Sequence, residues 1–161
     1  MRVLLAMLLV CLYTSLLAPN SEFGKTLNII DKECKRQGFS RFENKLTLGL
    51  FFTESSRLKN VSICEPKYIK KFNKCIQAHG PGQILYATAI GWEVGFKGSE
   101  SELRKVEVSV PLSIKFLAHL RKIYRGDWHK IISHYKSGKP YHKKYYVLAE
   151  KYSKKIAVDN R

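Results

Sequence analysis

One acidic residue and two neutral polar residues in the middle of the chain have side chains suited to cutting a sugar polymer. They lie in three short motifs, Thr53-Glu54-Ser55-Ser56, Gly80-Pro81-Gly82-Gln83-Ile84 and Tyr135-Lys136-Ser137-Gly138. Glycosidic cleavage needs a carboxylic acid that keeps its proton near neutral pH, and burial among apolar walls raises the pKa of a glutamate in that direction. We therefore take Glu54 as the candidate acid, with Gln83 and Tyr135 as candidate sugar-binding groups.

The first motif is predicted to close a helix. Ser40-Arg41-Phe42-Glu43 has the pattern of a capping box, in which Ser40 caps the helix and Glu43 reaches back to its backbone amide. Apolar residues recur at helical spacing after it, at Phe42, Leu46, Leu50 and Phe51. This spacing places Glu54 in the last turn, against an apolar stripe.

The second motif is predicted to lie between two helices. Pro66 suits the first position of a helix that Gly80 would end, and Gly80 and Gly82 allow a tight backbone turn. A short apolar helix is expected from Ile84 to Trp92, followed by a polar loop over 97–102. No segment shows a convincing strand pattern.

The third motif is predicted to lie at the end of a further helix. Pro111 opens the clearest helix of the chain, Asp127 caps the next one, and Gly138 ends it. A last basic helix is expected over 141–156. The sequence therefore predicts a nearly all-α fold in a single domain, since 161 residues suffice for one compact core.

The order of these motifs resembles the lytic transglycosylases of the soluble type, in the lysozyme-like superfamily. The resemblance runs from Glu54-Ser55-Ser56 through Gly82-Gln83-Ile84 and Thr88-Ala89, to Gly126-Asp127-Trp128, Tyr135-Lys136-Ser137-Gly138 and Tyr146-Val147, and it covers roughly 42–152. It implies a lysozyme-like domain of packed helices that cleaves peptidoglycan.

The resemblance also implies a role for each matched residue. Glu54 would protonate the leaving oxygen and then act as base toward the C6 hydroxyl of muramic acid, which leaves a 1,6-anhydromuramoyl end without a second carboxylate. Gln83 and Tyr135 would hold the N-acetylated sugar. Ser55 or Ser62 would bond a neighbouring sugar or Glu54 itself. Tyr146 is a further candidate substrate-binding residue, and neither a cofactor nor a metal is implied.

The sequence departs from the family pattern at several positions. Pro81-Gly82 replaces Leu-Met, Tyr86 replaces a proline, and Lys136 replaces an asparagine beside the sugar site. A muramidase-type hydrolase and a non-catalytic peptidoglycan-binding protein that retains the fold are therefore the alternatives. Glu93, which also has apolar neighbours, is the rival candidate for the acid.

The N-terminus has the composition of an export signal. Residues 1–18 are apolar behind one arginine, which predicts a signal peptide or a membrane anchor. We assign 19–39 to an N-terminal extension, 40–157 to the transglycosylase-like domain and 158–161 to a C-terminal tail. The expected location is the periplasm or the outer face of the inner membrane.

The charge is strongly basic. Lys and Arg number 29 against 13 Asp and Glu, a formal net charge of +16 that attracts polyanions. An exported protein meets anionic glycan or lipid headgroups, so a DNA-binding function, which would depend on charge alone, is disfavoured. The expected partners are peptidoglycan strands and a membrane or envelope-spanning secretion complex, with no specific nucleic acid and a monomeric chain. A solvated basic surface without a specific partner is the alternative.

Three cysteines follow the N-terminal segment, Cys34, Cys64 and Cys75. An oxidising compartment favours pairing two of them, but spacing alone does not decide which. If 66–77 formed a straight helix, Cys75 would lie too far along it to meet Cys64, which leaves Cys34 as a possible partner for either. No cysteine or histidine pair stands at metal-ligand spacing.

Overall fold

The computed structural model describes residues 21–158 except 56, 57, 60, 66, 67, 71, 72 and 142. The predicted signal or anchor at 1–18 therefore lies outside the described residues. Within the described part, no helix is both long and apolar enough to cross a membrane.

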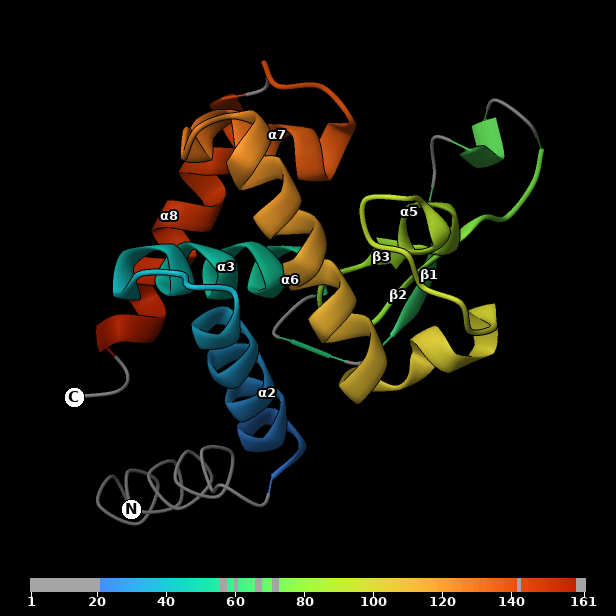
Figure 1. Cartoon of the computed structure of the whole chain (residues 1–161), viewed down its shortest axis with the longest axis horizontal. Coiled ribbons are helices and arrows are strands. Elements are labelled where there is room, and N and C mark those ends of the chain that lie inside the picture. The colour runs from blue at the N-terminus through green and yellow to red at the C-terminus, as the bar shows by residue number, and fades with distance from the viewer. Residues whose placement is uncertain are drawn as a thin grey trace, which may run out of the picture.

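The chain is mostly helical, as the sequence predicts, with a small sheet. Figure 1 shows the long helices gathered on one side and the sheet with α5 on the other. The elements are α2 (Glu22–Arg36), α3 (Arg41–Glu54), β1 (Ser62–Cys64), β2 (Gln77–His79), β3 (Ile84–Leu85), α5 (Tyr86–Ile90), the 3-10 helix η1 (Glu100–Arg104), α6 (Val106–Ile123), α7 (Trp128–Ser137) and α8 (Lys143–Val158).

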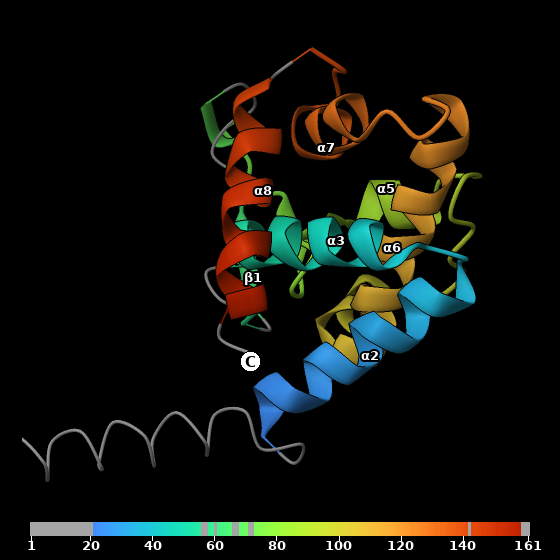
Figure 2. The same cartoon turned by 90° about the vertical axis from the view of Figure 1, so that its left-hand side faces the viewer.

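The main hydrophobic core lies among the long helices. Its fully buried members come from every one of them, and α3 crosses α8 at the closest helix contact (Figure 2). They include Ile30 of α2, Leu46 and Phe51 of α3, Ile114 and Leu117 of α6, Ile131 of α7 and Ala149 of α8. A smaller cluster of Ile84, Ala89 and Leu103 joins β3, α5 and η1. The molecule therefore has a helical body and a smaller sheet region, each with its own apolar centre.

The start of α3 is fixed as the sequence predicts. The capping box is present, with the Ser40 amide donating to Glu43 Oε2 at 2.7 Å. Glu43 is also buried; it accepts a hydrogen bond from Trp128 Nε1 at 3.2 Å and forms an ion pair with Arg121 Nε at 2.7 Å. Burial alone raises the pKa of Glu43, but these hydrogen bonds and the Arg121 charge outweigh it and the net shift is downward. One carboxylate thus ties α3 to α6 and α7.

Helix α2 belongs to the main core. Ile30 and Cys34 on it are fully buried in that core, and α2 packs against α6 and α3. The segment 19–39, which the sequence assigns to an extension, therefore contributes a helix to the folded body.

The sheet corrects two predictions from the sequence. Three strands pair antiparallel in the order β1-β2-β3, with Ser62 opposite His79 and His79 opposite Ile84. The expected absence of strands was wrong because strands of two or three residues are too short to show a period-2 pattern. The helix expected from Pro66 to Gly80 was also wrong, since only 68–70 are helical among its described residues and Gln77–His79 is a strand.

Other boundaries also differ from expectation: the helix expected from Ile84 to Trp92 is only Tyr86–Ile90, because Ile84–Leu85 pairs as β3. Helix α6 begins at Val106, so Pro111 lies inside it; buried Val106 and Val110 extend the face that Ile114 continues. Residues 100–102 of the loop expected over 97–102 belong to η1. The predicted cap by Asp127 is confirmed, because its side chain accepts from the Lys130 amide, and Gly138 ends α7 with φ 71°.

The disulfide joins Cys64 to Cys75, with a Cα–Cα distance of 5.1 Å, and Cys34 is a buried free thiol. Burial raises the pKa of the Cys34 thiol to about 12, which keeps it protonated and unreactive. The pairing that spacing left open is decided by the antiparallel strands β1 and β2, because Cys64 lies opposite Gln77 and Cys75 comes only two positions before Gln77.

We expect the Cys64→Ser/Cys75→Ser double variant to lose about 2–3 kcal/mol of unfolding free energy, because the cross-link no longer restricts the unfolded chain. Thermal unfolding followed by circular dichroism should show a Tm lower by roughly 5–10 °C. Dithiothreitol should lower the Tm of the original protein to a similar extent and leave the double variant unchanged. Equal sensitivity of both proteins to the reductant would contradict a structural disulfide at this position.

Candidate functional site

A cleft lies between the helical body and the sheet region. Its cavity volume is about 50 Å³, and the empty space rises to about 400 Å³ when the adjoining open solvent is included. Its lining comes from the end of α3, the sheet region, α5, α6 and α7: Glu54, Glu65, Gln83, Ile84, Leu85, Thr88, Phe116, Tyr135 and Lys136. The candidate acid Glu54 and the candidate sugar-binding residues Gln83 and Tyr135 therefore share one cleft.

Glu54 is the most enclosed charged group of the cleft. Helix α3 ends at this residue, and its side chain is only 4% exposed. Lys136, from the last turn of α7, places its Nζ 2.5 Å from Glu54 Oε2. A buried carboxyl is thus paired with an ammonium at the position where the resemblance implies a neutral asparagine.

The ion pair between Glu54 and Lys136 determines the charge that Lys136 carries in the cleft. Burial by itself lowers the pKa of Lys136, but the charge of Glu54, its hydrogen bond and the charge of Glu65 outweigh burial, and the net pKa is raised. Lys136 is therefore cationic throughout the neutral range. A cation in contact with a carboxyl favours the ionised carboxylate, which opposes the proton-holding effect of burial on Glu54.

Gln83 lies in a constrained turn. Its backbone has φ 51°, in the left-handed region that non-glycine residues seldom adopt. The side-chain amide nitrogen donates to the carbonyls of Gly80 at 2.8 Å and Val61 at 3.0 Å. Because both amide protons serve the protein backbone, the amide oxygen is the group that Gln83 can offer to a ligand.

Tyr135 is held against the same turn. Its hydroxyl donates to the Gly82 carbonyl at 2.7 Å, and a Cβ on Gly82 would lie 2.5 Å from Ser113 Oγ and 2.9 Å from that hydroxyl. Only glycine fits at this close approach. Desolvation, followed by the charge of Glu54, raises the pKa of the Tyr135 phenol although the Ser113 hydroxyl acts in the opposite sense, so the phenol stays neutral.

Two predicted substrate-binding residues lie outside the lining of the cleft. Ser55 is 1% exposed, and its hydroxyl donates to the Phe51 carbonyl at 2.9 Å, as a serine in a helix end often does. Tyr146 stacks on His129, with ring centroids 3.6 Å apart. Neither residue is placed to contact a sugar beside Glu54, because helix geometry turns Ser55 inward and Tyr146 toward α7.

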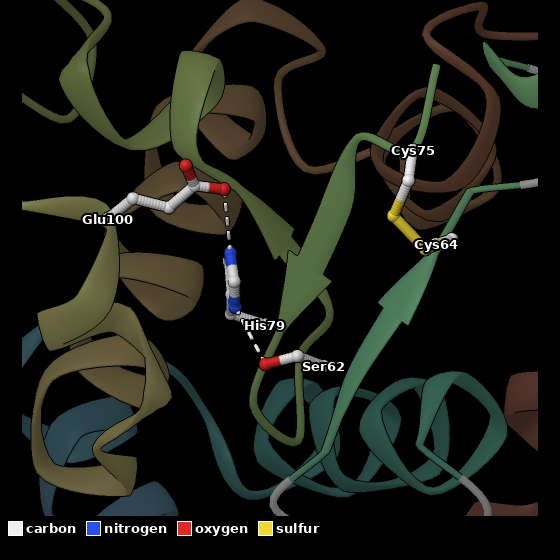
Figure 3. Close-up of a disulfide and its surroundings, with 5 residues drawn as sticks. All are labelled: Ser62, Cys64, Cys75, His79 and Glu100. Carbon is white, nitrogen blue, oxygen red and sulfur yellow. Dashed lines mark hydrogen bonds and ion pairs between the residues drawn. A yellow bond between two sulfur atoms is a disulfide. The ribbon is translucent and has the colours of Figure 1, made fainter. Parts of the chain in front are cut away.

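Ser62, the third such residue, belongs to a hydrogen-bonded chain in the sheet region (Figure 3). Its hydroxyl lies 2.8 Å from His79 Nδ1, and His79 Nε2 lies 3.1 Å from Glu100 Oε1. His79 is fully buried, while the Glu100 side chain is 51% exposed. The chain links β1 and β2 to η1, so Ser62 supports the sheet beside the cleft and does not line the cleft.

Glu65 and Phe116 are cleft residues that the sequence argument missed. Glu65 follows Cys64 directly, and its amide donates to the Ile76 carbonyl at 3.0 Å. The adjacent Cys64 was the sequence signal that could have drawn attention to Glu65. The helix expected from Pro66 onward led away from it. Glu93, the rival acid, does not line the cleft. In the described residues no group of three or more His, Cys, Asp or Glu side chains is arranged to hold a metal ion.

No protein-family model matches the sequence, and neither a curated protein nor a solved structure matches the chain.

Proposed function

We propose that the chain is a lysozyme-like peptidoglycan lytic transglycosylase that cleaves the β-1,4 bond between N-acetylmuramic acid and N-acetylglucosamine. One observation carries the proposal: the Glu54 side chain, 4% exposed, shares a cleft with Gln83 and Tyr135, although Glu54 and Tyr135 are 81 positions apart in the sequence. A carboxyl enclosed in a cleft that also holds neutral polar groups is the arrangement that acid-assisted glycosidic cleavage needs.

The reaction would use Glu54 twice. As an acid, Glu54 protonates the glycosidic oxygen, and the bond from that oxygen to C1 of the muramoyl residue breaks. As a base, the resulting carboxylate takes the proton of the C6 hydroxyl while that oxygen bonds to C1, which closes the 1,6-anhydro ring and restores the acid. The amide oxygen of Gln83 and the hydroxyl oxygen of Tyr135 would accept hydrogen bonds from the sugar.

The setting of this activity is also part of the proposal. The apolar residues 1–18 support export to the periplasm or the outer face of the inner membrane. There the protein would act as a monomer on glycan strands, and it would serve a secretion, conjugation or phage-entry apparatus that must open the cell wall.

The decisive experiment is mass spectrometry of muropeptides released from purified sacculi. Anhydro-ended products would support the transglycosylase. Reducing ends would favour a muramidase-type hydrolase, an alternative supported by Glu65, because two carboxylates in one cleft can activate and orient water. Binding to sacculi without release would favour a non-catalytic peptidoglycan-binding protein, an alternative supported by the Glu54–Lys136 ion pair, which favours the unprotonated acid.

The Lys136→Asn variant is expected to cleave at higher pH than the original protein. The raised pKa of Lys136 keeps its cation beside Glu54 at every pH of interest, and a neighbouring cation favours the charged form of a carboxyl. Without the cation, burial dominates and the acid remains protonated to higher pH. Release rates measured from pH 4 to 9 should therefore show the alkaline limb of the profile displaced upward.

The matched control is Lys136→Arg, which retains a cation at this position and should leave the alkaline limb where it is. An unchanged profile in Lys136→Asn would mean that the ion pair does not govern the protonation of the acid.

A further inference from the structure

One of the two tryptophans stands almost fully in water. Trp92 is 82% exposed, whereas Trp128 is 6% exposed. An indole is among the largest apolar surfaces that a side chain offers, so leaving it in solvent forgoes a substantial gain from burial. Ile90, the last residue of α5 and two positions before Trp92, is also 48% exposed.

The segment that carries Trp92 is tied down. Lys115 Nζ of α6 donates to the Val94 carbonyl at 2.5 Å, the Phe96 amide donates to the Ala89 carbonyl at 2.9 Å, and Val94 is buried. The ring of Trp92 meets His119 edge to face, with centroids 5.1 Å apart. The indole is therefore held at a defined place while most of its surface stays free.

Two elements connect this indole with the cleft. On α6, His119 follows the cleft residue Phe116 by three positions, so the two lie on one helix face about one turn apart. On α5, Thr88 lines the cleft four positions before Trp92. Trp92 thus contacts a residue that lies one turn along α6 from the cleft residue Phe116.

We propose that Trp92 is a stacking platform for a distal sugar of a β-1,4-linked N-acetylated glycan whose other sugars occupy the cleft. The inference rests on the proposed function for the identity of the glycan. A pyranose ring presents an apolar face of C–H groups, and a flat aromatic ring in a binding site covers such a face while the hydroxyls stay in water.

The charges of the cleft favour a glycan over a nucleic acid, although an exposed aromatic ring in a basic protein can also stack on a base. Among the described residues that line the cleft, Glu54 and Glu65 are acidic and Lys136 alone is basic. This acidic balance repels a phosphate backbone, whereas a chain of N-acetylated sugars without phosphate avoids the repulsion.

The test is calorimetric binding of chito-oligosaccharides of two and six sugars to the full chain. Trp92→Ala is expected to weaken binding of the six-sugar ligand roughly fivefold to tenfold, with less than about a twofold change for the two-sugar ligand, which is too short to reach both sites. Trp92→Tyr should restore most of the loss. The matched control is Tyr141→Ala, which removes another aromatic ring, 81% exposed and outside the cleft lining.

Fluorescence gives a second readout in the Trp128→Phe variant, whose remaining indole is Trp92. The six-sugar ligand should protect this indole from iodide quenching. Protection by single-stranded DNA but not by the sugar would overturn the proposal, as would equal six-sugar affinity in Trp92→Ala and the original protein.

The outcome for Trp92 is separable from that for catalysis. Trp92-dependent binding of the six-sugar ligand without muropeptide release would support the stacking role of Trp92 and exclude the transglycosylase activity. Muropeptide release with no effect of Trp92→Ala on six-sugar binding would support the transglycosylase activity and exclude the stacking role of Trp92. Failure of both oligosaccharides to bind would overturn the platform, while the sacculus experiment would still decide the enzyme.

Discussion

Replacement of Glu54 by glutamine is expected to lower muropeptide release from sacculi by roughly 100-fold to 10,000-fold, the range that a positioned acid and base contributes. Glutamine has nearly the same shape and occupies the same enclosed position at the end of α3, but it can neither give nor take the proton. The measurement is the rate of soluble muropeptide formation, followed by mass spectrometry under conditions in which the original protein is active.

The ion pair calls for a second variant beside Glu54→Gln. Removing Glu54 alone leaves the Lys136 ammonium without this carboxylate, and an uncompensated charge in an enclosed site destabilises a fold. The Lys136 side chain is 32% exposed and Glu65 also acts on its charge, so we expect the single variant to fold. Glu54→Gln/Lys136→Asn removes both charges and should be equally inactive. Undiminished release by either folded variant would exclude Glu54 as the acid.

The Gly49→Ala substitution is expected to destabilise the fold by about 3 kcal/mol or more. A Cβ at this position would meet the Ala149 carbonyl oxygen and lie 2.9 Å from the Ser153 amide nitrogen, both on the backbone of α8. Alanine favours a helix by about 1 kcal/mol over glycine, but backbone atoms cannot move aside as a flexible side chain can. The clash therefore outweighs the gain, and chemical denaturation should show the loss.

Gly38→Ala is the control for the added methyl group. Gly38 has φ 68° and open space around it, so the expected cost is only the conformational strain of about 1–2 kcal/mol. If Gly49→Ala proved as stable as the original protein, α3 and α8 would have to lie farther apart than the structure has them.

Local signals predicted the ends of the helices well. Ser40, Asp127 and Gly138 act where the sequence places them, because a cap or a left-handed glycine depends on the residues next to it. The grouping of Glu54, Gln83 and Tyr135 came from the resemblance, and the structure brings these three together in one cleft.

The short strands and the disulfide were beyond local prediction. A three-residue strand has no readable period, and its existence depends on a partner elsewhere in the chain, as Ser62 depends on His79. The helix expected after Pro66 was wrong for the same reason: pairing of Cys64–Cys75 and of β1 with β2 overrides the local helical pattern.

The sequence by itself determined the mostly helical class and the caps at Ser40, Asp127 and Gly138, and it offered Glu54, Gln83 and Tyr135 as polar candidates, because each depends on near neighbours or on residue type. Only the tertiary structure decided that Lys136 pairs with Glu54, that Glu65 enters the cleft, that Ser62 faces His79 and that Trp92 remains in solvent. These are contacts or exposures set by segments far apart in the chain, whose approach depends on how the helical body and the sheet region pack.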